Sequence, residues 1–272
     1  MTNRPRVLAT LEGYAVEGGF DRAHEPTTCY RPTITLGRHA GPGTADGLWH
    51  DYERVIELVP ALGLDGVRLS IEWARVEPRR GAVDGAALGR YRDVIDFARA
   101  LELDVTIVLV DAVWPAWLGL EAWLLPWTVP HVLAHASLLV RELGDVVTGV
   151  TPFSDATAMV ERGFLSASAP PWRRGATDDA RSARAQIERI VEALTADSLV
   201  GPRLVGASRT IALDKSIGEI TAQIAGASDC DEIYLRSLVR GSGPTQAPAG
   251  LLVKRGDVWA THASPELISA LG

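Results

Sequence analysis

The chain has 272 residues, of which 47% are apolar, and this is enough for one α/β domain with a large hydrophobic core. Its formal net charge is −7, and no Lys/Arg run extends beyond the pairs Arg79-Arg80 and Arg173-Arg174, which argues against a nucleic-acid or membrane-surface partner. No stretch approaches about 18 uninterrupted apolar residues, so we expect no membrane-spanning helix.

The cysteines and the N-terminus bear on the compartment. Cys29 and Cys230 lie far apart, without a CxxC motif or a metal-ligand spacing, which favours two reduced thiols. Residues 1–13 carry charge but lack the apolar core of a signal peptide. Lys215 and Lys254 are the only lysines among the 27 Lys and Arg residues, a bias typical of GC-rich bacterial genes. We therefore expect a bacterial, cytoplasmic protein.

The predicted elements alternate between strand and helix along most of the chain. Apolar, β-branched runs predict strands, and apolar residues at helical spacing predict helices. The Gly- and Pro-rich residues 21–47 predict a long loop over the mouth of the fold. We expect strands at 7–11, 66–71, 104–110, 146–150, 203–213 and 232–239, and helices at 49–62, 129–143 and 178–199.

Charged residues stand where two of these strands end. Glu72 and Arg75 follow the second predicted strand, and Asp111 follows the third. In α/β proteins the site lies at the carboxyl ends of the strands, so we expect these side chains at the mouth of the fold.

No cofactor or metal is expected. The phosphate-binding motifs GxGxxG and GxxxxGKS/T are both missing. His131 and His135 are spaced i, i+4 on a predicted helix and could bind a metal, but no HExxH glutamate or third ligand accompanies them. An ordinary helix face is the simpler interpretation.

Three segments in chain order carry a family resemblance. They are GYAVEGG at 13–19, LGLDGVRLSIEWARVEP at 62–78 with its flanking segments, and DVVTGVTPFSDA at 145–156. Together they resemble glycoside hydrolase family 1, the β-glucosidase-type (β/α)8 barrels, from about residue 8 to about residue 175. The resemblance implies an α/β, TIM-barrel-like fold. We expect an incomplete barrel of about six β/α units, forming one domain over 1–272 that lacks the last two units of the family barrel.

The resemblance also implies positions for site residues on the first two strands. Tyr14 and Glu17 fall on matched positions, whereas Ala15 stands where the family has a sugar-binding glutamine. Arg68 matches the arginine that lies beside the family's nucleophile. Glu72 occupies a position usually filled by serine.

On the third and fourth strands the sequence departs further from the family. Asp111 stands where the family has a sugar-binding histidine. If Thr151 matches the family threonine, Ser154 replaces the acid/base glutamate, and Asp155 falls one residue late. A glycosidase needs a carboxylic acid to protonate the leaving oxygen and a second carboxylate, and serine cannot be that acid.

The later strands add three further candidates. Arg209 lies near the end of the fifth predicted strand, and Arg236 stands in the sixth where the family has asparagine. GDVWATHASPELISALG resembles the segment around the family's sixth helix and places Trp259 on a matched position.

Two features keep two interpretations each. Glu72 could act as a catalytic acid or base, or could form a buried ion pair with Arg68 or Arg75. The tryptophan-rich loop after the third strand, which includes Trp114, could stack on a sugar, or could cover the barrel edge or a partner subunit.

Because both carboxylates of the retaining mechanism are absent or displaced, we do not expect an ordinary β-glycosidase. The first hypothesis is an enzyme of bacterial specialised metabolism that performs proton-transfer chemistry, such as elimination, cyclisation or isomerisation, on a small and possibly anionic substrate. The predicted catalytic residues are Glu72, Asp111, Glu17 and Asp155, and the predicted substrate-binding residues are Arg68, Tyr14, Trp114, Ser154, Arg209, Arg236 and Trp259.

Two other hypotheses remain open. The chain could be a non-catalytic, ligand-binding or stabilising subunit of a heteromeric enzyme, or a residual glycoside hydrolase. The family's nucleophile lies beyond the position of Gly272, and six parallel units alone would expose two sheet edges. We therefore expect a homodimer or a heteromeric partner that covers the open edge of the barrel.

Overall fold

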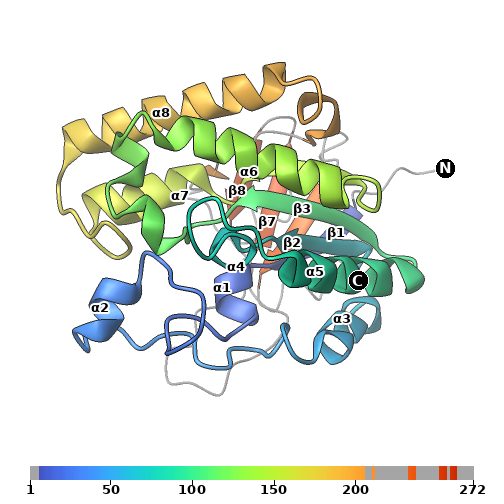
Figure 1. Ribbon diagram of the computed structural model, residues 1–272. Coiled ribbons are helices and arrows are strands. Elements are labelled where there is room, and N and C mark those ends of the chain that lie inside the picture. The colour runs from blue at the N-terminus through green and yellow to red at the C-terminus, as the bar shows by residue number, and fades with distance from the viewer. Residues whose placement is uncertain (1–5, 206–209, 212–231, 237–250, 256–257, 262–272) are drawn as a thin grey trace, which may run out of the picture.

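The computed structural model describes residues 6–205, 210–211, 232–236, 251–255 and 258–261 (Figure 1). The described strands form one eight-stranded sheet in the order β4-β3-β2-β1-β6-β7-β8-β5. Its strands are β1 (Arg6–Leu11), β2 (Gly66–Ser70), β3 (Asp104–Val110), β4 (Gly149–Phe153), β5 (Thr210–Ile211), β6 (Glu232–Arg236), β7 (Leu251–Arg255) and β8 (Val258–Thr261).

Strands β1 to β4 are parallel and adjacent in chain order, as in the first half of a (β/α)8 barrel. The parallel register places Thr10 opposite Arg68, and Arg68 opposite Thr106. Beyond β4, a parallel bridge joins Val150 to Leu204. The carboxyl ends of β1 to β4 therefore meet at one edge of the sheet.

Helices connect these strands and cover one side of the sheet (Figure 1). The Asp84 carboxylate accepts hydrogen bonds from the N–H groups of Ala86 and Ala87 and so caps the N-terminus of the helix that leads into β3. The helices are α1 (Gly13–Val16), α2 (Arg31–Thr35), α3 (Tyr52–Ala61), α4 (Trp73–Val76), α5 (Gly85–Ala100), α6 (Thr128–Leu143), α7 (Ala156–Val160) and α8 (Thr177–Ala196), with short 3₁₀ turns at Ala116–Leu118, Ala122–Leu124 and Gly201–Arg203 and a π-helical turn at Glu161–Leu165.

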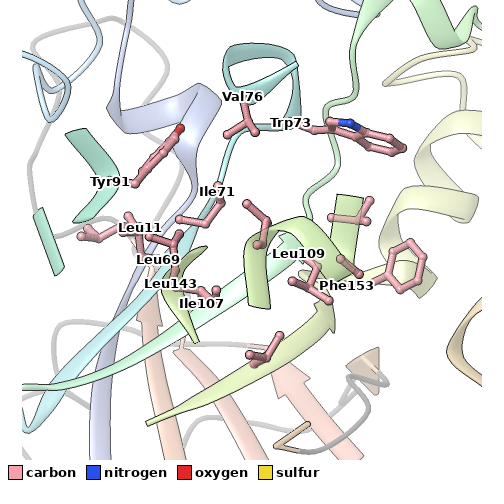
Figure 2. Close-up of a cluster of buried hydrophobic side chains, with 14 of the residues drawn as sticks. Leu11, Leu69, Ile71, Trp73, Val76, Tyr91, Ile107, Leu109, Leu143 and Phe153 are labelled. Carbon is pink, nitrogen blue, oxygen red and sulfur yellow. The ribbon is translucent and has the colours of Figure 1, made fainter. Parts of the chain in front are cut away.

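The hydrophobic core lies between the sheet and these helices. Side chains alternate between the two faces of a strand, and the members of β2 and β3 that join the core are every second residue, with Val110 added at the end of β3. Figure 2 shows Leu69, Ile71, Ile107 and Leu109 in this cluster, with Leu143 of α6 among them. Burial of this face is the main source of stability for the α/β layer.

The opposite face of the same strands is polar. Thr10, Arg68, Ser70, Thr106 and Thr151 occupy the alternate positions and are at most 2% exposed. This face continues at the strand ends into the charged residues of the site. One face of the sheet thus packs against the helices, and the other carries polar side chains toward the site.

The second half of the sheet departs from the expected series of parallel units. Strand β6 pairs parallel to β1, but β7 pairs antiparallel to both β6 and β8. Only residues 256 and 257 separate β7 from β8, and so short a connection joins antiparallel neighbours alone. The glycine-containing GD dipeptide between them was a hairpin signal that the sequence analysis did not use.

Most of the expected elements in the first part of the chain are confirmed, with one shift that matters for the site. The fifth strand, expected at 203–213, is described as a strand only at Thr210–Ile211, and Arg203 ends a 3₁₀ turn. The strands at 7–11, 66–71 and 104–110 and the helices at 49–62, 129–143 and 178–199 match within a few residues. The fourth strand, expected at 146–150, lies at Gly149–Phe153 instead. Val146 and Val147 still belong to the turn after α6, where they pack into the core, so their apolar character did not indicate a strand.

Within the described part of the chain, every helix is either too short or too polar to cross a membrane.

Two glycine substitutions test the fold from opposite sides. A Cβ on Gly66 in β2 would lie 2.2 Å from the carbonyl oxygen of Asp104, whereas a Cβ on Gly89 inside α5 would meet no atom within 4 Å. We expect Gly66→Ala to lower the free energy of unfolding by about 1–3 kcal/mol. Gly89→Ala should raise it by about 0.5–1 kcal/mol through helix propensity. Urea unfolding of both variants checks this, and equal effects would contradict the register of β2 on β3.

Candidate functional site

A cavity of about 60 Å³ opens at the carboxyl ends of β1, β3 and β4. It is where parallel strands of an α/β protein place a site. Its polar lining combines carboxylates, hydroxyls and one guanidinium. The residues that line it are Glu12, Tyr30, Asp111, Ala112, Ser154, Asp155, Ala158, Met159, Arg162, Ala169 and Pro170.

Asp111 follows β3 directly and is the most enclosed carboxylate on the cavity, with 6% of its surface exposed. Its Oδ1 accepts a hydrogen bond of 2.7 Å from the N–H of Ala112. The sequence analysis predicted its place at the mouth, and the cavity brings it together with Ser154 and Asp155, as expected.

Ser154 and Asp155 follow β4. Asp155 is the N-cap of α7, with Oδ1 accepting from the N–H of Ala158 at 2.8 Å. The Ser154 hydroxyl is buried without a hydrogen-bond partner and belongs to the lining of the cavity. The register shift of β4 produces this arrangement, because it brings Phe153 into the strand and leaves Ser154 and Asp155 at its end.

Beneath the cavity, Glu17 anchors a buried network. Its Oε2 lies 2.8 Å from Arg75 Nε, and its Oε1 accepts a 2.7 Å hydrogen bond from the Tyr91 hydroxyl. The Arg75 guanidinium lies between the rings of Phe20 and Trp49, 4.2 and 3.8 Å from their centroids. Burial raises the pKa of Glu17, and the ion pair with Arg75 opposes that rise.

Glu72 belongs to the same network but is held differently. Its Oε1 accepts a 2.8 Å hydrogen bond from the N–H of Tyr14, and its Oε2 is buried without a hydrogen-bond partner. Burial, with the nearby charges of Asp111 and Glu17, raises the pKa of Glu72 well above its usual range. Its surroundings therefore favour the neutral carboxylic acid over the carboxylate.

The expected ion pair of Glu72 with Arg68 or Arg75 is not found among the described residues, and its catalytic role stays a prediction. Arg75 pairs with Glu17, and within the described residues no ion pair joins Glu72 to Arg68 or Arg75. Nor does Glu72 line the cavity. A Cβ on Gly13 would lie 2.3 Å from Glu72 Cγ, so the carboxyl group depends on a glycine at the end of β1.

Three predicted binding residues have structural contacts instead. Arg68 Nη2 donates to the carbonyl oxygens of Phe153 and Ser154, at 3.2 and 3.1 Å, and so holds the end of β4. The Tyr14 hydroxyl donates to Asp21. Trp114 is fully buried, donates from Nε1 to the carbonyl of Gly119, and packs edge-to-face on a second buried tryptophan, Trp123.

The remaining predicted residues lie on less well described parts of the chain. Arg209 lies outside the described residues. Arg236 lies on β6 and Trp259 on β8, a strand where the resemblance had suggested the surroundings of a helix. The expected roles of these three residues stay predictions.

The histidine pair lies on α6 without a metal-binding arrangement. His135 is buried, stacks on Trp73 at 4.6 Å, and its Nε2 lies 3.2 Å from the carbonyl oxygen of Leu109. Desolvation lowers its pKa to about 3. Across the described residues, no group of three His, Cys, Asp or Glu side chains could hold a metal ion.

Sequence reasoning missed Glu12, Tyr30 and Arg162 on the cavity. Glu12 could have been predicted from the sequence, because it follows β1 just as Asp111 follows β3. Arg162 could not have been predicted. It lies in the π-helical turn that continues α7, and a one-residue insertion in a helix has no sequence signature.

Parallel strands with carboxylates at their carboxyl ends are typical of a (β/α) barrel with its site at the mouth. The model of Glycosyl hydrolase family 1 matches residues 9–199, and the chain belongs to this family.

Curated relatives are similar over the same part of the chain. Beta-glucosidase 21 of Oryza sativa subsp. japonica is 29% identical over 172 residues, which cover 61% of this chain and 33% of the relative. Putative beta-glucosidase 5 of Arabidopsis thaliana is 30% identical over 169 residues, covering 60% and 32%. A 6-phospho-beta-galactosidase of Clostridium acetobutylicum is 28% identical over 137 residues, covering 50% and 29%. The chain spans about a third of the length of these relatives.

Solved structures show the same fold. A beta-glycosidase from Pyrococcus horikoshii superposes with a TM-score of 0.65 at 21% identity, covering 78% of this chain and 49% of that one. An aphid myrosinase superposes with a TM-score of 0.67 at 16% identity, covering 82% and 50%. These likenesses confirm the partial TIM-barrel fold.

The comparisons overturn the first functional hypothesis. A lyase, cyclase or isomerase of bacterial specialised metabolism is wrong, because the similar proteins are named β-glucosidases and glycosidases and none points to that chemistry. The expected anionic substrate stays a prediction: Arg68 donates to carbonyl groups of the protein, and the roles expected for Arg209 and Arg236 stay untested.

The raised pKa of Glu72 predicts how the free energy of unfolding depends on pH. In the wild type the unfolded chain releases the Glu72 proton near pH 4.3, and the folded protein releases it at higher pH, so stability falls between these values as the pH rises. Glu72→Gln keeps the size of the side chain and cannot ionise. We expect the variant to be more stable than the wild type at pH 7 and to lose this part of the slope.

Urea unfolding between pH 4 and pH 8 measures both effects. Glu17→Gln is the matched control, and it should destabilise the protein because it leaves Arg75 buried without its partner. A variant at Glu72 that is as destabilised as the one at Glu17 would show that Glu72 is ionised in the folded protein.

Proposed function

We propose that the chain binds a glycoside at the mouth of its barrel and takes part in the hydrolysis of the glycosidic bond. The observation that carries the proposal is that Asp111 and Asp155 line one cavity at the carboxyl ends of the strands, in a chain of Glycosyl hydrolase family 1. Hydrolysis needs one carboxylic acid that protonates the leaving oxygen and a second carboxylate that attacks or activates water.

We assign proton donation to Asp155. Its position after β4 and its N-cap hydrogen bond to Ala158 fix the carboxyl group against the cavity. The side chain is one methylene shorter than a glutamate, and the extension of β4 to Phe153 brings it forward.

The other carboxylates on the cavity have separate roles. Asp111, enclosed at the end of β3, holds the sugar by accepting hydrogen bonds from it. Glu12, at the end of β1, is the candidate among the described residues for the second catalytic carboxylate. Glu17 and Glu72 do not touch the ligand in this proposal, and they position the ends of β1 and β2.

The role of Asp155 is tested with aryl β-glucosides that differ in the acidity of the leaving phenol. A good leaving group departs without protonation, whereas a poor one needs the acid. For Asp155→Asn we expect kcat to fall by about a hundredfold or more on the least acidic phenols and little on dinitrophenol.

Asp197→Asn is the matched control, because the half-buried Asp197 also caps a helical turn, by accepting from the N–H groups of Leu199 and Val200, and does not line the cavity. A uniform loss across the leaving-group series in Asp155→Asn would sink its assignment as proton donor. Wild-type protein without turnover of any glycoside would sink the proposed function.

A partner that covers the edge of the barrel, either a second copy or another protein, stays a prediction, as does a small-molecule substrate in the cytoplasm. Light scattering of the native chain measures its mass in solution. We expect a defined oligomer, and a stable monomer at micromolar concentration would contradict the expectation.

A further inference from the structure

Asp111 is a buried carboxylate without a basic partner. It is 6% exposed, its Oδ1 hydrogen bond comes from a backbone N–H, and none of the ion pairs between described residues includes it. A charge removed from water is costly unless an opposite charge compensates it. The cavity is therefore built around a negative charge that the described protein groups leave uncompensated.

One basic side chain, Arg162, lines the cavity together with Asp111 among the described residues. Arg162 is exposed, and none of the ion pairs between described residues joins it to Asp111. It therefore does not compensate the Asp111 carboxylate.

Among the described residues, the two buried arginines, Arg68 and Arg75, donate hydrogen bonds to groups other than Asp111. Arg75 donates to Glu17 and to the carbonyl of Gly18, and Arg68 donates to two carbonyls at the end of β4. Ser154 supplies a second, independent feature, since its hydroxyl is 2% exposed, lines the cavity and has no partner. A hydroxyl oxygen can accept a hydrogen bond from a cationic donor.

We propose that the site takes an amino sugar, with Asp111 paired to the protonated amine and Ser154 Oγ accepting a second of its N–H bonds. The sugar part of this assignment rests on the proposed function. The amine is added by the geometry, because a neutral hydroxyl in its place would leave the Asp111 charge uncompensated. A hydrogen bond between an ammonium group and a carboxylate is also stronger than one between a neutral sugar hydroxyl and the same carboxylate.

The experiment measures binding of free sugars to the full chain by calorimetry at low salt. The probes are glucose, its three analogues with an amine at C2, C3 or C6, and N-acetylglucosamine as a neutral control. We expect one amino analogue to bind about tenfold to a hundredfold more tightly than glucose. Its affinity should fall as the pH rises through the pKa of the ligand amine, while that of glucose stays constant.

Asp111→Asn should reduce the affinity for the amino analogue to that for glucose. Asp178→Asn, at an exposed position at the start of α8, makes the same change in net charge and should have no effect. Should Asp111→Asn fail to fold, the pH dependence of the wild type still decides. Equal affinities for glucose and all amino analogues, no amino-sugar binding, or equal losses in the two variants would overturn the proposal.

These outcomes separate the inference from the proposed function. Turnover of aryl glucosides with no preference for an amine would remove the amino-sugar assignment and leave glycoside hydrolysis standing. Tight, pH-dependent binding of an amino sugar without turnover would remove hydrolysis and support the Asp111 assignment.

Discussion

The buried ion pair between Glu17 and Arg75 is the interaction on which the site depends. It ties the turn after β1 to the turn after β2, and the Tyr91 hydroxyl from α5 closes the network on Glu17. Loss of one partner from such a pair typically costs about 3–5 kcal/mol, because the other charge stays buried. Phe20 and Trp49 on the two faces of Arg75 enclose it further, so the strand ends are fixed before any ligand binds.

This fixed pair determines the charge of the groups around it. Arg75 pairs with Glu17, whereas burial beside Asp111 and Glu17 raises the pKa of Glu72. Asp111 is enclosed at the end of β3, and Asp155 keeps its place through the N-cap of α7. Three carboxyl groups on adjacent strand ends thus differ in their surroundings, which is how one barrel can divide proton donation, ligand binding and structural support among chemically similar residues.

The two faces of the sheet explain how the family fold persists where the family's site residues have changed. Apolar side chains on the helix-facing side of β1 to β4 preserve the packing, and they tolerate no charge. Substitutions on the polar side leave that apolar packing in place, except where they remove a partner of the buried Glu17–Arg75 pair. The core residues therefore preserve the fold of Glycosyl hydrolase family 1, whereas a few strand-end residues determine which reaction the site can support.

The sequence by itself determined the first half of the barrel. Local periodicity indicated β1 to β3, α3, α6 and α8, and the strand-end rule indicated Asp111, because these signals depend on neighbours in the chain. Only the tertiary structure decided which acid pairs with Arg75. Glu17 and Glu72 have the same side chain, and the fold places the carboxylate of Glu17 within ion-pair distance of Arg75. The register of β4, the place of Trp114 in the core and the cavity position of Arg162 were decided in the same way, by packing between segments that are distant in sequence.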